Sequence, residues 1–193
     1  MRHRSLDIIR DEHSSLAAML QSMRLLVDRG PGDDPKTFFD VLRAMLLYID
    51  EFPERLHHPK ETELLFPAVL RAAPEAAGAI ARLDRDHEYT ESAVRDIQHL
   101  LLGWELLGES RRSEFTEAFG KYVDLYLDHM RLEEQEVLPA AEKSLSEAEW
   151  KVLDEAFEKN CDPLTGKYEP SAIYDRLFTR IVMKAPAPIG LGD

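Results

Sequence analysis

The chain has 193 residues, 44% of them hydrophobic, which is long enough for one domain with a substantial core and short for two. With 37 acidic and 24 basic residues it carries a formal charge of −13, which argues against a nucleic-acid partner. The one cysteine, Cys161, provides no disulfide framework. No stretch is apolar enough for a signal peptide or a membrane span, so we expect a cytoplasmic protein with no membrane partner.

The first predicted helix covers residues 5–28, with Ser5 as its N-cap. Its apolar stripe, spaced by three and four residues, also contains His13. A turn-forming segment at 29–35 leads into a second helix from about residue 36. The apolar stripe of this helix jumps five residues from Phe52 to His57 beside Pro53, which predicts a kink. Pro59 lies inside the turn from His57 to Glu61 but removes only the bond to the Arg55 carbonyl, so the hydrogen bond from the Glu61 N–H to the His57 carbonyl can survive.

A third helix is predicted over residues 74–107 and a fourth over 111–143, with His87 and His129 on their apolar stripes. Four helices joined by short turns predict an all-α protein, an up-down-up-down four-helix bundle over residues 1–143. Cofactor sites in such bundles are built from side chains on facing helices, and all the stripe histidines face that interior.

Residues 144–193 are predicted to form a C-terminal helical extension and tail. A short helix at 146–160 begins with a capping box of Ser146 and Glu149. A loop and a second short helix at 171–183 follow, with Ile173, Leu177 and Ile181 as its apolar stripe. Because this stripe needs a surface to cover, we expect the extension to support a homo-oligomer.

The same histidine and glutamate pattern occurs twice. HHPKETELLFP places Glu61 four residues after His57, and HMRLEEQEVLP places Glu133 four residues after His129. Residues four apart share one face of a helix, so each pair can aim an imidazole and a carboxylate at one point. One more histidine lies upstream of each copy, at the end of IRDEH and of LDRDH. The candidate metal ligands are therefore His13, His57, Glu61, His87, His129 and Glu133.

A single histidine on an apolar stripe is more often a hydrogen-bonded core residue than a ligand. Four such histidines together with two glutamates are different, because burying a carboxylate without a partner costs several kcal/mol. A cation that joins these groups removes that cost. The set therefore indicates a metal site, and no catalytic nucleophile, phosphate loop or dinucleotide motif competes with this interpretation.

Three further residues are open candidates. Glu91 is a seventh ligand or a hydrogen-bond acceptor near the site. His58 is expected on the surface together with His3 and His99, but it remains a candidate because it adjoins a ligand. Tyr126 is expected to be a packed core residue whose hydroxyl can also reach a ligand or a bound small molecule.

Imidazole and carboxylate ligands suit iron, with manganese or zinc as alternatives. Six protein ligands are too many for one open site and fit two ions, with Glu61 and Glu133 bridging between them. The arrangement resembles the hemerythrin-like family of HHE cation-binding domains, and its bacterial type in particular. The resemblance covers about residues 5–143 and rests on DEH at 11–13, HHPKETELLFP at 57–67, DH at 86–87 and HMRLE at 129–133.

The resemblance implies a non-haem di-iron protein that binds O2, NO or iron itself in oxygen or stress physiology. Two positions differ from the oxygen-carrying hemerythrins: Glu91 replaces their second histidine, and Glu133 lies four residues after its histidine where they have an aspartate at five. A di-iron oxidoreductase that consumes peroxide or NO is an alternative. A sensor module that reports metal or oxygen to a partner protein is another, and fold and ligands are shared by all three.

Overall fold

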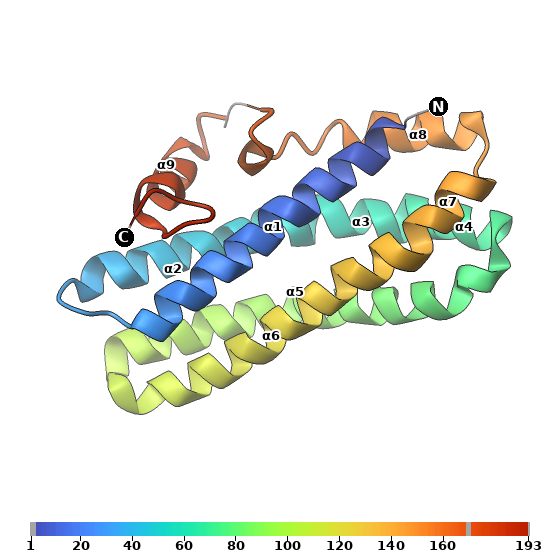
Figure 1. The fold of residues 1–193 in the computed structure, drawn as a ribbon. Coiled ribbons are helices and arrows are strands. Elements are labelled where there is room, and N and C mark those ends of the chain that lie inside the picture. Colours follow the sequence, from blue (N-terminus) through green and yellow to red (C-terminus); the bar gives the residue numbers. More distant parts are fainter. Residues whose placement is uncertain (1–2, 169–170, 193) are drawn as a thin grey trace.

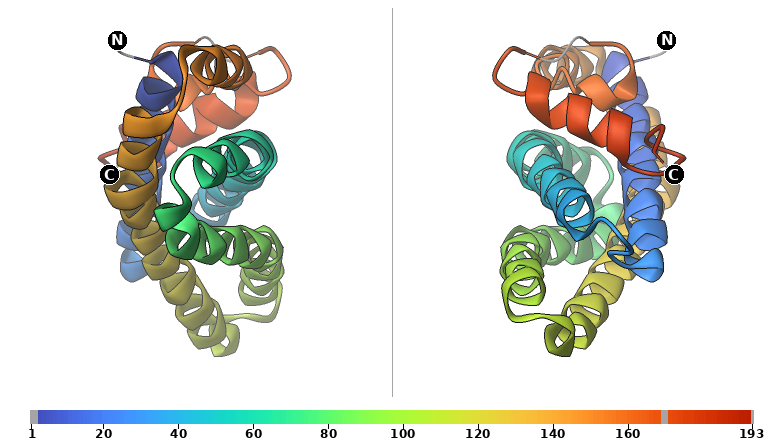
Figure 2. Two further views of the ribbon diagram at one scale, coloured as in Figure 1. Left: turned by 90° about the vertical axis from the view of Figure 1, so that its right-hand side faces the viewer. Right: turned by 90° about the vertical axis from the view of Figure 1, so that its left-hand side faces the viewer.

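The computed structural model describes residues 3–168 and 171–192 of the chain. Four helical arms run up, down, up and down, which confirms the predicted all-α bundle (Figures 1 and 2). The first arm is α1 (Arg4–Arg29). The second contains α2 (Pro35–Ile49), η1 (Asp50–His57), α3 (His58–Lys60), η2 (Glu61–Leu65) and α4 (Phe66–Ala72). The third contains η3 (Pro74–Ala76) and α5 (Ala77–Leu107). The fourth contains η4 (Glu109–Arg111), α6 (Arg112–Leu132), η5 (Glu133–Val137) and α7 (Leu138–Ser144).

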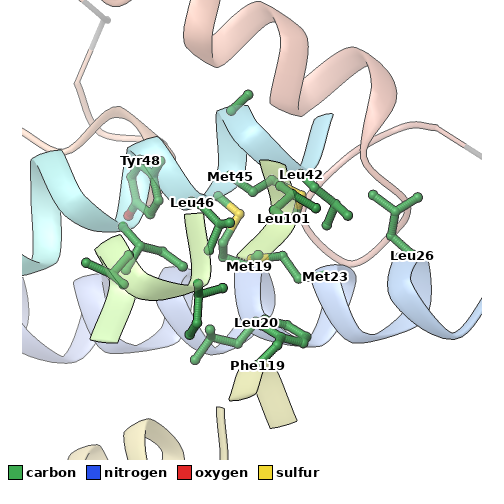
Figure 3. Packing of buried hydrophobic residues seen from close by; sticks show 14 of the residues in the cluster. Met19, Leu20, Met23, Leu26, Leu42, Met45, Leu46, Tyr48, Leu101 and Phe119 are labelled. Carbon is green, nitrogen blue, oxygen red and sulfur yellow. The ribbon is translucent and has the colours of Figure 1, made fainter. Parts of the chain in front are cut away.

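Two separate apolar clusters hold the arms together. One fills the end of the bundle where α1, α2, α5 and α6 meet, with Met19, Leu42, Leu101 and Phe119 at its centre (Figure 3). The other fills the opposite end, where η2, α4 and α7 pack on the beginnings of α1 and α5. The candidate ligands lie between these clusters, so a polar layer is held in place by apolar packing on both sides.

Three π-helical segments, η1, η2 and η5, interrupt the arms that carry the repeated motif. In them backbone N–H groups reach five residues back: His58 donates to the Pro53 carbonyl, and Phe66 donates to the Glu61 carbonyl. The predicted kink near Pro53 therefore takes the form of a widened turn, a feature common at functional sites. The predicted bond from Glu61 to the His57 carbonyl is wrong, because the Glu61 N–H donates to His58 instead.

The helix ends agree only partly with the sequence. The predicted N-cap Ser5 lies inside α1, and its hydroxyl donates to the Asp154 carboxylate at 2.7 Å. The N-cap of α1 is His3, whose side chain makes no capping bond. The capping box of Ser146 and Glu149 is confirmed at the beginning of α8 (Glu147–Phe157). Ser5 is thus used to join the first arm to the extension.

The C-terminal extension packs on its own bundle. Helix α8 contacts α1, η6 (Pro163–Thr165) also contacts α1, and α9 (Asp175–Lys184) lies against α2 (Figure 1). The ring of Phe178 packs 5.4 Å from that of Phe52, and Ile181 is fully buried. Ile173 is 83% exposed, so its predicted place in the stripe is wrong and Phe178 takes it. Among the described residues, no helix has the length and apolarity needed to cross a membrane.

Candidate metal centre

Two groups of four ligand-type side chains lie side by side in the bundle. The first group consists of His58, Glu61, His87 and His129, and the second consists of His13, His57, Glu61 and Glu133. Within each group one ligand atom from every residue lies within 4.8 Å of the others, and all of these side chains are buried. All six ligands predicted from the sequence are brought together, and Glu61 belongs to both groups.

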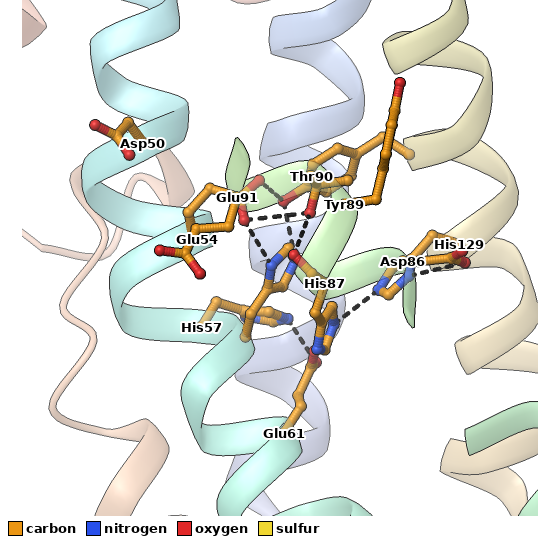
Figure 4. Close-up of polar contacts among 12 residues, drawn as sticks. Asp50, Glu54, His57, Glu61, Asp86, His87, Tyr89, Thr90, Glu91 and His129 are labelled. Atoms are coloured by element: carbon orange, nitrogen blue, oxygen red, sulfur yellow. Dashed lines mark hydrogen bonds and ion pairs between the residues drawn. The ribbon is translucent and has the colours of Figure 1, made fainter. Parts of the chain in front are cut away.

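The ring nitrogens that face inward approach one another and the carboxylate of Glu61. Glu61 Oε1 lies 2.6 Å from His57 Nε2, and its Oε2 lies 3.3 Å from His87 Nε2 (Figure 4). His87 Nε2 and His129 Nε2 are 3.2 Å apart. In the second group Glu133 Oε2 lies 3.4 Å from His13 Nε2. Electron-pair donors from all four arms thus converge on a space that a cation would occupy.

The outward-facing nitrogen of each ring lies near a polar group, and all except that of His129 are within hydrogen-bond reach of it. Nδ1 of His57 lies 2.6 Å from Glu12, and Nδ1 of His13 lies 2.9 Å from Glu134. The corresponding partners are Glu54 for His58 at 3.0 Å, Thr62 for His87 at 2.9 Å and Asp86 for His129 at 3.5 Å. A metal-binding histidine commonly donates its other N–H to a carboxylate or another oxygen, which fixes the ring and its tautomer.

Glu54 is the centre of a buried hydrogen-bond network above the first group. Its carboxylate accepts from the hydroxyls of Tyr122, Tyr126 and Thr90 at 3.1, 3.3 and 3.2 Å. Burial raises the pKa of Glu54 to about 7, although these donors act in the opposite direction. The network fixes His58, because the same carboxylate contacts its Nδ1 and the Tyr126 hydroxyl lies 2.9 Å from its Nε2.

In the second group, carboxylates and imidazoles lie close together and are shielded from solvent. Burial lowers the pKa of His13, but the carboxylates of Glu133 and Glu134, which accept hydrogen bonds from the protonated ring, outweigh it and raise the pKa to about 9. Burial and the nearby charge of Glu61 raise the pKa of Glu133 above its ordinary range. Without an ion, protons therefore take the place that a cation would fill.

The pKa of Glu61, the carboxylate that belongs to both groups, is shifted in the opposite direction to that of Glu133. Burial raises the pKa of Glu61, but the charge of His57 outweighs it and holds the pKa well below the usual range. Burial in turn disfavours charge on His57, yet Glu61 and Glu12 raise the pKa of that ring well above its ordinary value. The pKa of His58 lies well below the usual range, because of burial and then of repulsion from His87. This ring is therefore neutral and can offer a lone pair to a metal.

Buried polar atoms without a hydrogen-bond partner show whether a metal fits this site. Nine buried side-chain nitrogen and oxygen atoms of the described residues have no hydrogen-bond partner, and six of them point into the two groups. These six are Nε2 of His13, Nε2 of His57 and both carboxylate oxygens of Glu61 and of Glu133. Buried polar atoms are rarely left unpaired, and such atoms cost about 1–3 kcal/mol each. A donor set of imidazoles and carboxylates around these atoms fits transition-metal ions.

A small cavity lies beside the rings. Its volume is ≈ 20 Å³, enough for one water-sized molecule. Four histidines of the two groups, His13, His57, His58 and His129, contribute to its wall. The rest of the wall is formed by Glu12, Leu16, Tyr48, Phe52, Pro53, Leu56, Tyr126, Met130, Asn160 and Asp162.

The residues left open as additional ligands lie in different environments. His58 is buried and belongs to the first group, so its expected surface position is wrong. Glu91 lies outside both groups, is exposed and bonds to Arg95 at 3.0 Å, which contradicts a place among the ligands. Tyr126 is a packed core residue that also reaches the cavity, as expected. His99 is exposed as expected.

His3 is another exception to the expected surface positions, because it is buried and stacks on Trp150 with ring centroids 4.2 Å apart. The sequence also missed the outward partners of the ligands. Glu12 and Glu134 each adjoin a predicted ligand in the chain, and this adjacency was a usable signal. Asn160 and Asp162 carry no such signal, because they reach the cavity from the extension.

The matching family agrees with this geometry. Residues 4–141 match the family described as hemerythrin HHE cation binding domain. The chain belongs to the hemerythrin HHE family. The matched region contains all the side chains of both four-residue groups, whereas the extension lies beyond it. A comparison with curated proteins found no match. Membership of the HHE family means that a cation is the expected occupant of the site.

Proposed function

We propose that this HHE-family protein is a non-haem di-iron protein that binds a diatomic ligand, O2 or NO, in oxygen or stress physiology. Iron suits a site of imidazoles and carboxylates, with manganese or zinc as alternatives. The ligands in this site are the six residues predicted from the sequence and His58 as a seventh. The proposed ligands are His13, His57, His58, Glu61, His87, His129 and Glu133.

The observation that carries the proposal is the shared position of Glu61. This carboxylate is fully buried, has no hydrogen-bond partner, and is a member of both four-residue groups. One oxygen faces His57 and the other faces His87. A carboxylate with its two oxygens directed at two imidazole groups can bridge two ions. Glu133 is grouped with His13 and His57, and its role as a second bridge remains a prediction.

The cavity supports a small ligand rather than a large substrate. Its ≈ 20 Å³ has room for one molecule of about the size of water or a diatomic gas. Non-haem iron supplies an open coordination position and redox chemistry to such a ligand. The protein contributes the enclosure, with apolar wall residues such as Leu16 and Phe52. It also contributes the side chain of Tyr126 to the cavity wall.

Metal analysis and a ligand assay test the proposal together. Protein from iron-supplemented cells is expected to contain about two iron ions per chain, and Glu61→Ala is expected to weaken the binding of both. The exposed variant Glu91→Ala is the matched control and should keep both ions. A single ion that persists in Glu61→Ala would contradict the dinuclear site.

The diferrous protein is then mixed with O2 or NO in a stopped-flow spectrometer. A stable adduct without turnover supports a binding protein. Repeated consumption of NO or peroxide would instead identify the di-iron oxidoreductase, which uses the same ligands. Changed affinity for a partner protein on metal loading would indicate the sensor module. The cytoplasmic location and the homo-oligomer remain predictions.

A further inference from the structure

The extension reaches the proposed metal centre through Asn160. This residue follows α8 and is 96% buried, since only 4% of it is exposed. Its Nδ2 donates a hydrogen bond of 2.9 Å to Glu12 Oε2, the same oxygen that lies 2.6 Å from Nδ1 of His57. Asn160, Glu12 and His57 thus form a chain of hydrogen bonds that ends at a proposed ligand. The residues matched to the HHE family end before Asn160.

The other side of the Asn160 amide is also occupied. Its Oδ1 accepts a hydrogen bond from the ammonium group of Lys60, which lies on the arm that carries His57. The amide therefore bridges α1 and the second arm at the level of the site. An amide offers a donor on one side and an acceptor on the other, so its orientation here is set by its two partners.

Neighbouring contacts hold Asn160 in place from both directions along the chain. Before it, Phe157 at the end of α8 is fully buried, with its ring 5.9 Å from that of His57. After it, Asp162 accepts a hydrogen bond from the Tyr48 hydroxyl at 2.6 Å. Asn160 and Asp162 both line the small cavity. The extension thus contributes packing against a ligand ring, part of the cavity wall and a hydrogen bond to the partner of that ring.

We propose that Asn160 is a positioning residue for the metal centre, which holds the Glu12 carboxylate that orients His57. The proposal rests on the di-iron function proposed above. Glu12 has three rotatable side-chain bonds, and the donated N–H restricts it to the rotamer that faces His57. Loss of a partner that orients a metal ligand typically costs about 10- to 100-fold in metal affinity. The segment beyond the HHE domain therefore completes the site instead of merely covering the bundle.

Cobalt(II) binding to the full chain tests this role, because its visible spectrum reports ligand geometry and its affinity is measured by competition with a chelator. Asn160→Ala is expected to weaken cobalt binding about 10- to 100-fold and to change the spectrum. Asn160→Asp keeps the size of the side chain but places a carboxylate beside Glu12, and it is expected to weaken binding at least as much. Thr165→Ala is the matched control, because it removes the hydrogen bond of 2.7 Å from the Thr165 hydroxyl to the Asp162 carbonyl in the same loop without touching Glu12 or the cavity.

Two results would overturn the proposal: wild-type affinity and spectrum in Asn160→Asp, or an equal loss in Thr165→Ala, which would mean that Asn160 only anchors the loop. The Nδ1–H signal of His57 in the metal-free protein provides a second measurement, which is expected to shift in both Asn160 variants. If Asn160→Ala does not fold, the isosteric Asp variant decides. If the wild type binds no metal, the di-iron function fails, whereas the His57 signal still tests the role of Asn160.

Discussion

Replacing Asp162 by asparagine should stabilise the metal-free protein at neutral pH. Asp162 is 3% exposed, and burial raises the pKa of its carboxyl from the ordinary 3.8 to about 6, although hydrogen bonds from Tyr48 and Leu164 act against the rise. One pKa unit corresponds to about 1.4 kcal/mol, so ionisation of this carboxyl costs the folded state about 3 kcal/mol. Asparagine avoids this cost, because it stays neutral and can still accept the hydrogen bond from the Leu164 N–H.

The direction in which stability changes with pH follows from proton binding by Asp162. Between pH 4 and 6 the folded protein holds the Asp162 proton more tightly than the unfolded chain, so rising pH lowers stability through this window. Stability from this group is therefore fully present below pH 4 and lost above pH 6. If the altered bond to Tyr48 costs about 1 kcal/mol, the variant gains about 2 kcal/mol at pH 7. That gain corresponds to roughly 4–8 °C in Tm.

Thermal unfolding of chelator-treated wild type and Asp162→Asn at pH 4, 5, 6 and 7 measures this difference. The advantage of the variant is expected to appear between pH 4 and 6 and then stay constant. Asp124→Asn is a control at a 74% exposed carboxylate, where no such change is expected. A difference between wild type and Asp162→Asn that is the same at pH 4 and pH 7 would refute the reasoning.

Three further predictions follow from the site and the extension. His58→Ala should lower metal content or affinity, whereas the exposed His99→Ala should not; equal metal analysis for the two would exclude His58 as a ligand. Glu91→Gln should leave metal content and the spectrum of the iron-loaded protein unchanged, and a changed spectrum would return Glu91 to the centre. Phe178→Ala should cost about 3 kcal/mol by opening a cavity under α9, or roughly 6–12 °C in Tm. At the 83% exposed Ile173, alanine should change stability by less than about 0.5 kcal/mol; equal losses would contradict the packing of α9.

The bundle and the grouping of the six candidate ligands could be predicted from the sequence because both are recorded in local spacing. Apolar residues at intervals of three and four mark the helices, and histidine and glutamate four apart share a helical face. The jump of five from Phe52 to His57 was also informative. It matches the span of the hydrogen bond in a π-helix, in which an N–H donates to the carbonyl five residues back, as that of His58 does to Pro53. Interpreted as a kink, the jump gave the wrong prediction that His58 lies on the surface.

What the sequence did not predict depends on contacts between distant segments. Glu91 lies one turn after His87, yet α5 directs it to solvent and Arg95 binds it. The burial of His3 depends on Trp150, far along the chain. Asn160 is the only asparagine in the chain and sits in a loop without periodicity, so only the packing of α8 on α1 brings it to Glu12. Local spacing holds no information on such contacts.

Both ligand groups are divided between the halves of the bundle, with a mechanical consequence. The first half, residues 4–72, supplies two members of one group and three of the other, and the second half, residues 77–144, supplies the rest. Neither helical hairpin alone contains a complete group. Bound ions would therefore cross-link the two hairpins. Without bound ions, the contact between the hairpins would depend on the two apolar clusters at its ends.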